Sequence, residues 1–119
     1  MSYYIGVEDL VANALIEIVE NTGKRSVSFT DLQKYGDAII ARLKKDNTDA
    51  ILIFSRDRTA QFFHDCSDVF TITEKNDNVI ISLNEGISTT YLRNRFRVRL
   101  ALAILTAFVS QEAIKTIIN

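Results

Sequence analysis

Apolar residues recur every three to four positions near the start of the chain and predict an amphipathic helix. The repeating positions are Val7, Leu10, Val11, Ala14, Leu15, Ile18 and Val19. This spacing places the side chains on one face of a helix, where they can be buried together. Glu8 and Asp9 would lie in the first turn, where the helix dipole favours negative charge. Gly23 follows the last turn and is expected to end the helix.

A second helix is expected after a short β-prone stretch, RSVSF, at residues 25–29. Ser28 precedes Asp31 by three residues, which is typical of a helix N-cap followed by an acidic first turn. The apolar face of this helix would hold Phe29, Leu32, Gly36, Ile39, Ile40 and Leu43. The polar residues 44–49 would end it, with Lys44 and Lys45 as a basic last turn.

The middle of the chain predicts a strand and a third helix. Residues 50–54, AILIF, are apolar and β-branched and indicate a short buried strand. Ser55 or Asp57 can cap the helix that follows. On that helix Ala60, Phe63 and Phe62 are expected to face the core.

Residues 69–83 predict a β-hairpin. Apolar and polar residues alternate on both arms, and KNDN at residues 75–78 supplies the turn. The alternation predicts that four side chains point into the core: Phe70, Ile72, Val79 and Ile81.

An apolar stripe in the last third of the chain predicts a long helix from about residue 88 to about residue 117. Its members are Leu92, Phe96, Leu100, Ala103, Ile104, Ala107 and Phe108. Ser88 or Thr89 can cap the helix. The stripe is long for one small domain to cover, so we expect the helix to act as a dimerisation element. In that arrangement Leu100, Ile104 and Phe108 would be buried between two copies.

Arginines at alternate positions offer a second interpretation of the same stretch. Arg93, Arg95, Arg97 and Arg99 would all face one side of a β-strand, whereas on a helix they divide into two pairs. Residues 100–111 contain no Gly, Pro, Asn or Asp to turn a strand into the following helix, so the pattern favours a helix.

The composition predicts a single α+β domain spanning residues 1–119, in a cytoplasmic protein. Hydrophobic residues make up 47% of the chain, which is enough to form a core. Cys66 is the only cysteine, so no disulfide can form within the chain. The uncharged residues 100–111 are too few to span a membrane. The formal net charge of −1 gives the protein no strong attraction to a polyanion.

The predicted order of elements resembles that of a winged helix-turn-helix domain over residues 7–84. The stretches that carry the resemblance are VSFTDLQKYGDAIIARL (27–43), SRDRTAQFFHDCSDVF (55–70) and FTITEKNDNVIISL (70–83). The resemblance implies an α+β fold in which the two-stranded hairpin is the wing and a long C-terminal helix follows. The strand at residues 50–54 departs from the usual layout of that superfamily.

The resemblance also implies that the third helix enters the major groove of DNA by its N-terminal residues. The residues expected to contact DNA or another partner are Arg56, Arg58, Thr59, Gln61, Lys75, Asn76, Asn78, Arg93, Arg95, Arg97 and Arg99. Arginine and glutamine can pair with base edges or hold phosphate. The alternative is that these residues are solvated charges and turn residues, and Asp57 beside the arginines favours that alternative.

Two functions of different kinds remain open from the sequence. One is a regulatory or accessory protein that reads double-stranded DNA as a homodimer. The other is a protein-interaction module of the same fold, such as an adaptor or a small inhibitor of a larger complex, and the near-neutral charge favours it. A weaker third option is a single-strand binder that uses Tyr3, Tyr4, Tyr91 and the arginines.

No catalytic or metal-binding pattern is present in the sequence. His64, Asp65, Cys66 and Asp68 diverge around a helix and cannot form a four-ligand zinc set. Cys66 has no orienting partner of the kind that a nucleophile needs. We therefore expect no enzyme activity, no cofactor, no small-molecule substrate and no membrane association.

Overall fold

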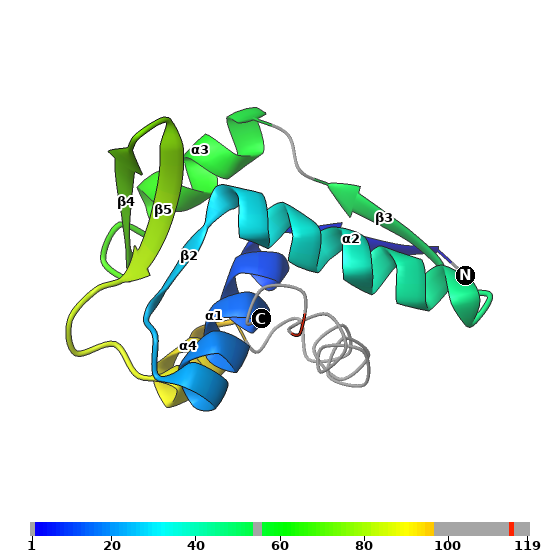
Figure 1. Ribbon diagram of the computed structural model, residues 1–119, viewed down its shortest axis with the longest axis horizontal. Helices are drawn as coiled ribbons and strands as arrows, with labels where there is room; N and C mark the ends of the chain where they lie inside the picture. The colour runs from blue at the N-terminus through cyan, green and yellow to red at the C-terminus, as the bar shows by residue number, and fades with distance from the viewer. Residues whose placement is uncertain (1, 54–55, 97–114, 116–119) are drawn as a thin grey trace.

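The computed structural model describes residues 2–53, 56–96 and 115, which form helices packed against two small sheets (Figure 1). This mixed α and β architecture agrees with the α+β class expected from the sequence. The elements in chain order are β1 (Ser2–Gly6), α1 (Val7–Thr22), β2 (Ser26–Ser28), α2 (Phe29–Lys45), β3 (Asp49–Ile53), α3 (Arg56–Asp65), β4 (Phe70–Lys75), β5 (Asn78–Leu83) and α4 (Thr89–Arg95).

The larger sheet is antiparallel and has the strand order β2-β5-β4. Ile81 of β5 lies opposite Val27 of β2 and Ile72 of β4. The smaller sheet is a parallel pair, in which Ser2–Gly6 of β1 runs beside Asp49–Ile53 of β3. Figure 1 shows the hairpin and β3 at different ends of the molecule, separated by α2 and α3.

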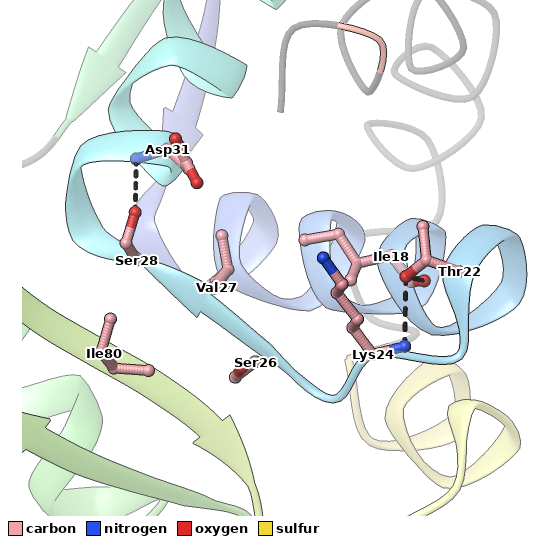
Figure 2. A pocket seen from close by; sticks show the side chains of 8 residues that line it. All are labelled: Ile18, Thr22, Lys24, Ser26, Val27, Ser28, Asp31 and Ile80. Carbon is pink, nitrogen blue, oxygen red and sulfur yellow. Dashed lines mark hydrogen bonds between the residues drawn. The ribbon is translucent and has the colours of Figure 1, made fainter. Parts of the chain in front are cut away.

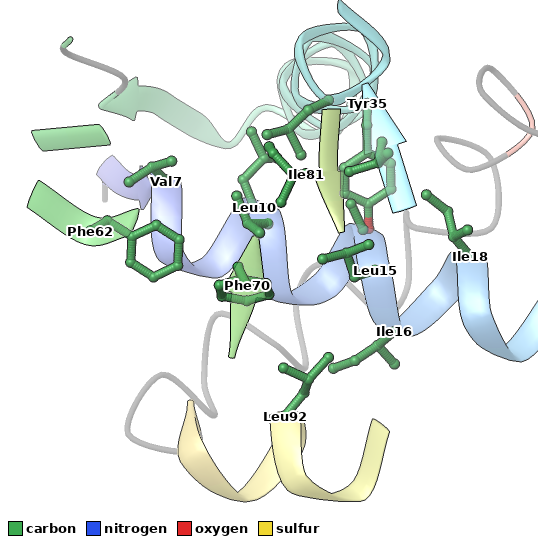
Figure 3. Close-up of a cluster of buried hydrophobic side chains, with 14 of the residues drawn as sticks. Val7, Leu10, Leu15, Ile16, Ile18, Tyr35, Phe62, Phe70, Ile81 and Leu92 are labelled. Atoms are coloured by element: carbon green, nitrogen blue, oxygen red, sulfur yellow. The ribbon is translucent and has the colours of Figure 1, made fainter. Parts of the chain in front are cut away.

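Helix α1 lies at the centre of the core (Figure 3). Leu10 and Leu15 of α1 are fully buried, and so are Ile81 of the sheet and Leu92 of α4. Tyr35 of α2 is also fully buried. The core therefore joins α1, α2, α4 and the antiparallel sheet in one cluster.

A helix end, a helix cap and the hairpin turn are confirmed at the positions predicted from the sequence. Gly23 adopts a left-handed conformation with φ of 75°, and its amide donates to the Val19 carbonyl at 2.9 Å. The Ser28 hydroxyl accepts a hydrogen bond from the Asp31 amide at 3.0 Å, as an N-cap does. Asn76 and Asp77 both have positive φ, which is the backbone of a two-residue hairpin turn.

The strand predicted at residues 50–54 exists as β3, but the expectation of a buried strand is wrong for Ile51. Ile51 exposes 51% of its surface to solvent. The reason is that β3 pairs with β1 rather than entering the larger sheet. Strand β1 itself was not predicted, because only the parallel pairing across α1 and α2 makes Ser2–Gly6 a strand.

Two of the four hairpin side chains predicted to be buried are not. Phe70 and Ile81 lie in the core, but 40% of Ile72 is exposed and Val79 is half-buried. Ile72 and Val79 instead line a groove beside α2 and α3, where they are only partly covered. On α3, Phe62 is buried whereas Ala60 is exposed, so the inward face is rotated from the predicted one.

Helix α4 is shorter than the predicted helix at residues 88–117. Ser88 caps it by accepting a hydrogen bond from the Tyr91 amide at 3.0 Å, as predicted. It ends at Arg95, with Phe96 as the C-cap. Arg97, Arg99, Leu100, Ile104 and Phe108 lie outside the described residues. Among the helices that are described, none has the length and apolar character needed to cross a lipid bilayer.

Candidate functional site

An apolar groove lies where α2, α3 and the hairpin meet. It has a volume of about 440 Å³. Its lining comes from the start of α2, one face of α3 and both hairpin strands: Phe29, Gln33, Thr59, Ala60, Phe63, Ile72 and Val79. None of these lining residues carries a charge. The pattern of residues along the chain does not predict this groove.

The groove forms because apolar residues of the hairpin, Ile72 and Val79, lie outside the buried core and line its edge. Ile72 lies opposite the buried Ile81, and two residues nearer the tip, on the same face, Val79 lies opposite Glu74. The apolar face of the hairpin therefore continues beyond the core. Phe29 approaches this face from the first residue of α2, directly after the Ser28 cap.

Aromatic packing fixes the floor of the groove. The ring of Phe63 meets Phe70 edge-on, with centroids 6.2 Å apart, and lies 5.1 Å from the ring of Phe62. Phe62 and Phe70 are core residues. Because Phe63 is held by buried rings, the groove is formed before any partner arrives, which lowers the cost of binding.

The polar groups of the groove are few and uncharged. Gln33 is exposed and Thr59 is half-buried, and both line the cavity. A mainly apolar cavity with a small number of polar groups is typical of a recognition site in which the polar groups fix orientation. Of the residues expected to touch DNA, Thr59 is thus placed in an apolar groove.

Two of the other predicted contact residues on α3, Arg58 and Gln61, lie at its surface. Arg58 is exposed, and the neighbouring Asp57 is exposed as well. The Gln61 amide donates to the Asp65 carboxylate at 2.7 Å, so this side chain is engaged within its own helix. Arg56 is the first residue of α3.

The hairpin tip carries both signs of charge. Lys75, Asn76 and Asn78 are exposed there, as expected for a wing. Glu74 and Asp77 are exposed within the same short stretch and outweigh the one lysine. A tip of this kind offers little attraction to a phosphate backbone.

The two described arginines of the alternating run form ion pairs within the chain. Arg93 of α4 lies 2.6 Å from the Glu20 carboxylate of α1. Arg95 lies 2.5 Å from the carboxylate of Asp68, in the turn between α3 and β4. Arg93 and Arg95 therefore pair with carboxylates on different elements of the fold.

Arg95 also changes the pKa values of two neighbouring groups, the Asp68 carboxyl and the Cys66 thiol. Its hydrogen bond lowers the pKa of the Asp68 carboxyl below the ordinary value. The nearby Cys66 is buried, and burial raises the pKa of its thiol. Arg95 approaches the Cys66 sulfur at 3.9 Å, which opposes that rise without cancelling it. A thiol held protonated in this way is a poor nucleophile.

No group of metal ligands is found within the described ranges. His64 is exposed and its ring lies 3.5 Å from the Asp65 carboxylate, while Cys66 is buried on the other side of the helix end. His64 and Cys66 are therefore divided between solvent and core.

A second, smaller cavity of about 260 Å³ lies between the end of α1, β2, the start of α2 and β5 (Figure 2). The hydroxyls of Thr22 and Ser28 line it, but each accepts a hydrogen bond from a backbone amide, of Lys24 and Asp31 respectively. The remaining charges are one lysine and one aspartate at its rim. This arrangement is explained by helix capping and selects no ligand.

Comparison of the chain with protein-family models, with curated proteins and with solved structures gives no match. The apolar groove is consequently the best-defined candidate site among the described residues, and its function has to be inferred from its chemistry.

Proposed function

We propose that this chain is a protein-interaction module of winged-helix-like architecture, whose groove binds an apolar segment of a partner protein. The observation that carries the proposal is the uncharged groove between α2, α3 and the hairpin. It occupies the place where a DNA-binding winged helix would present charged side chains of the recognition helix beside the wing.

The order of strands supports the winged-helix part of the proposal. Strand β2 falls between α1 and α2, the hairpin follows α3, and the sheet order is β2-β5-β4. In this arrangement the hairpin corresponds to the wing and α3 to the recognition helix. The parallel pair of β1 and β3 is an addition to that layout.

The chemistry of the groove favours apolar side chains from a partner. Burying one large apolar side chain is worth roughly 1.5–3 kcal/mol. The rings of Phe29 and Phe63 together with Ile72 supply the apolar contacts. The amide of Gln33 and the hydroxyl of Thr59 can hydrogen-bond to the partner's backbone, which would fix its direction.

The proposed function is tested by selecting short random peptides on the immobilised protein and measuring their affinity. We expect the selected peptides to be rich in apolar residues and to bind with micromolar dissociation constants. Ile72→Lys places a charge in the groove and should weaken binding by about tenfold or more. Ile51→Lys is the matched control, because it makes the same change at an exposed strand residue outside the groove.

Two results would contradict the proposal. One is a failure to select any peptide on the folded protein. The other is a selected peptide that binds Ile72→Lys as tightly as it binds the unsubstituted chain. Circular dichroism of both variants confirms that a loss of binding does not come from unfolding.

Binding of double-stranded DNA is the second candidate function. The observation in its favour is that Arg58 is exposed near the start of α3, within the same winged-helix-like order. If DNA is the partner, Arg58→Ala should cost about 1–3 kcal/mol of binding free energy and should reduce its salt dependence. Fluorescence anisotropy with a labelled duplex at several salt concentrations measures both, and salt-sensitive binding that is lost in Arg58→Ala would favour DNA.

A further inference from the structure

Strand β3 forms one side of a very small parallel sheet. Its five residues, Asp49–Ile53, pair with Ser2–Gly6 of β1. Within the described ranges it pairs with no other strand, so one of its edges has no backbone partner there. Its central residue is Ile51, of which 51% is exposed. This is the largest exposed fraction among the large hydrophobic residues whose burial the structure describes.

An arrangement of this kind is uncommon for physical reasons. Parallel sheets are normally larger and buried on both faces. A two-stranded sheet is only marginally stable in water. Here α2 packs against β3, yet Ile51 remains exposed. The small parallel sheet of β1 and β3, with its exposed isoleucine, is therefore what we would expect of one part of a larger sheet.

The sequence of β3 lacks the features that usually protect an edge. Natural edge strands carry lysine or proline, are bulged, or are very short. The residues of β3 are DAILI, with no lysine, proline or glycine and with a single charge at the first position. An open, apolar and regular edge of this kind readily accepts another strand.

We propose that β3 pairs antiparallel with β3 of a second copy of this chain, across a twofold axis at Ile51, to make a four-stranded sheet in the order β1-β3-β3-β1. This interface goes beyond the proposed partner groove, which is lined by residues of α2, α3 and the hairpin. Figure 1 shows the hairpin and β3 at different ends of the molecule.

Self-complementarity of β3 argues for a second copy as the partner. In an antiparallel pair centred on Ile51, all five residues of each strand are matched. Ile51 then faces Ile51, and Asp49 faces Ile53 of the other copy. The two Asp49 carboxylates lie at opposite ends of the pair, so no like charges face each other. A twofold interface requires this kind of match between identical surfaces.

The proposal is tested by sedimentation of the full chain at micromolar concentrations. We expect the unsubstituted protein to form dimers. Ile51→Lys places two ammonium groups opposite each other and should raise the dimer dissociation constant by about tenfold or more. Ile72→Lys is the control at an exposed strand residue away from β3 and should leave the dimer intact.

A second measurement does not depend on a disruptive variant. Residues directly opposite each other in an antiparallel pair have Cβ atoms about 4.5–5.5 Å apart, within reach of cross-linking. Under mild oxidation Ile51→Cys should form a covalent dimer, whereas Ile72→Cys should not. Cys66 is buried and serves as the internal control in the unsubstituted chain.

Three outcomes would overturn the proposal. The first is a protein that stays monomeric throughout. The second is a dimer that survives Ile51→Lys and is lost in Ile104→Asp, because pairing would then depend on the C-terminal segment. The third is equal cross-linking of Ile51→Cys and Ile72→Cys, which would indicate random collision.

Discussion

The guanidinium of Arg95 lies 2.5 Å from the carboxylate of Asp68 and joins the end of α4 to the turn between α3 and β4. The same guanidinium donates a second hydrogen bond from Nη1 to the Tyr91 hydroxyl at 3.1 Å. Next to this pair, the ring of Phe96 stacks on Phe70 with centroids 6.3 Å apart. Arg95, one of the arginines expected to contact a partner, thus pairs with a carboxylate of its own chain.

Replacement of this arginine should cost more stability than replacement of its neighbour in the run. The Arg95 side chain is 28% exposed and the Arg93 side chain is 54% exposed, so water weakens the Arg93–Glu20 pair more. We expect Arg95→Met to lower the free energy of unfolding in urea by more than Arg93→Met does. Equal losses for the two variants would contradict a special role for Arg95.

The contribution of Asp68 should disappear in acid. Its folded-state pKa lies below the ordinary value of 3.8 because Arg95 stabilises the carboxylate. A lowered pKa adds stability above the unfolded-state value, and this stability is lost as the pH falls through the folded-state pKa. The unsubstituted protein should be more stable than Asp68→Asn at neutral pH. The difference should shrink as the pH falls below 3.8 and vanish below the folded-state pKa, and a difference that persists in stronger acid would require another cause.

Tyr35→Phe should stabilise the protein. Tyr35 is fully buried, and its hydroxyl has no hydrogen-bond partner among the described residues. A buried polar group without a partner costs about 1–3 kcal/mol, and the substitution removes that cost while keeping the ring. Thermal or urea unfolding measures the difference. A loss of stability in Tyr35→Phe would show that the hydroxyl makes a favourable interaction.

The same phenol should make the protein sensitive to alkali. Burial, and secondly the charge of Glu17, raise the pKa of Tyr35 above its ordinary value of 10.0. The unfolded chain then releases this proton at a lower pH than the folded protein does. Stability should therefore fall as the pH rises above 10, and by less in Tyr35→Phe. Parallel alkaline denaturation curves for the two proteins would contradict this.

The hairpin turn offers a stabilising substitution of a different kind. Asp77 has φ of 65°, a conformation that glycine adopts without strain. Asp77→Gly also creates the Asn-Gly turn that hairpins favour. We expect a gain of up to about 1 kcal/mol in the free energy of unfolding, because the left-handed conformation costs a residue with a Cβ atom roughly 1–2 kcal/mol and the added chain entropy of glycine offsets part of this. Asp77→Val should instead destabilise the hairpin, and the opposite ranking of the two variants would contradict the turn geometry.

Features set by neighbouring residues could be predicted from the sequence. Helix α1 and its end at Gly23, the Ser28 cap and the hairpin turn all depend on contacts within a few positions. These local preferences agree with the tertiary structure, so periodicity and capping rules found them.

Features set by pairing between distant residues could not be predicted in the same way. Ser2–Gly6 becomes a strand only because it meets Asp49–Ile53, and the exposure of Ile51 follows from that pairing. The partners of Arg93 and Arg95 lie on other elements. The groove arises because Ile72 and Val79 extend past the core, which alternation along the strand cannot reveal.

The most direct test of the proposed interaction function is to map a selected peptide onto the protein by NMR. The measurement records which methyl and amide signals shift when the peptide is added to isotope-labelled protein. We predict that the largest shifts occur at Ala60, Phe63, Ile72 and Val79, which line the groove. Shifts that spare these residues and concentrate elsewhere on the described surface would contradict the proposal that the groove is the binding site.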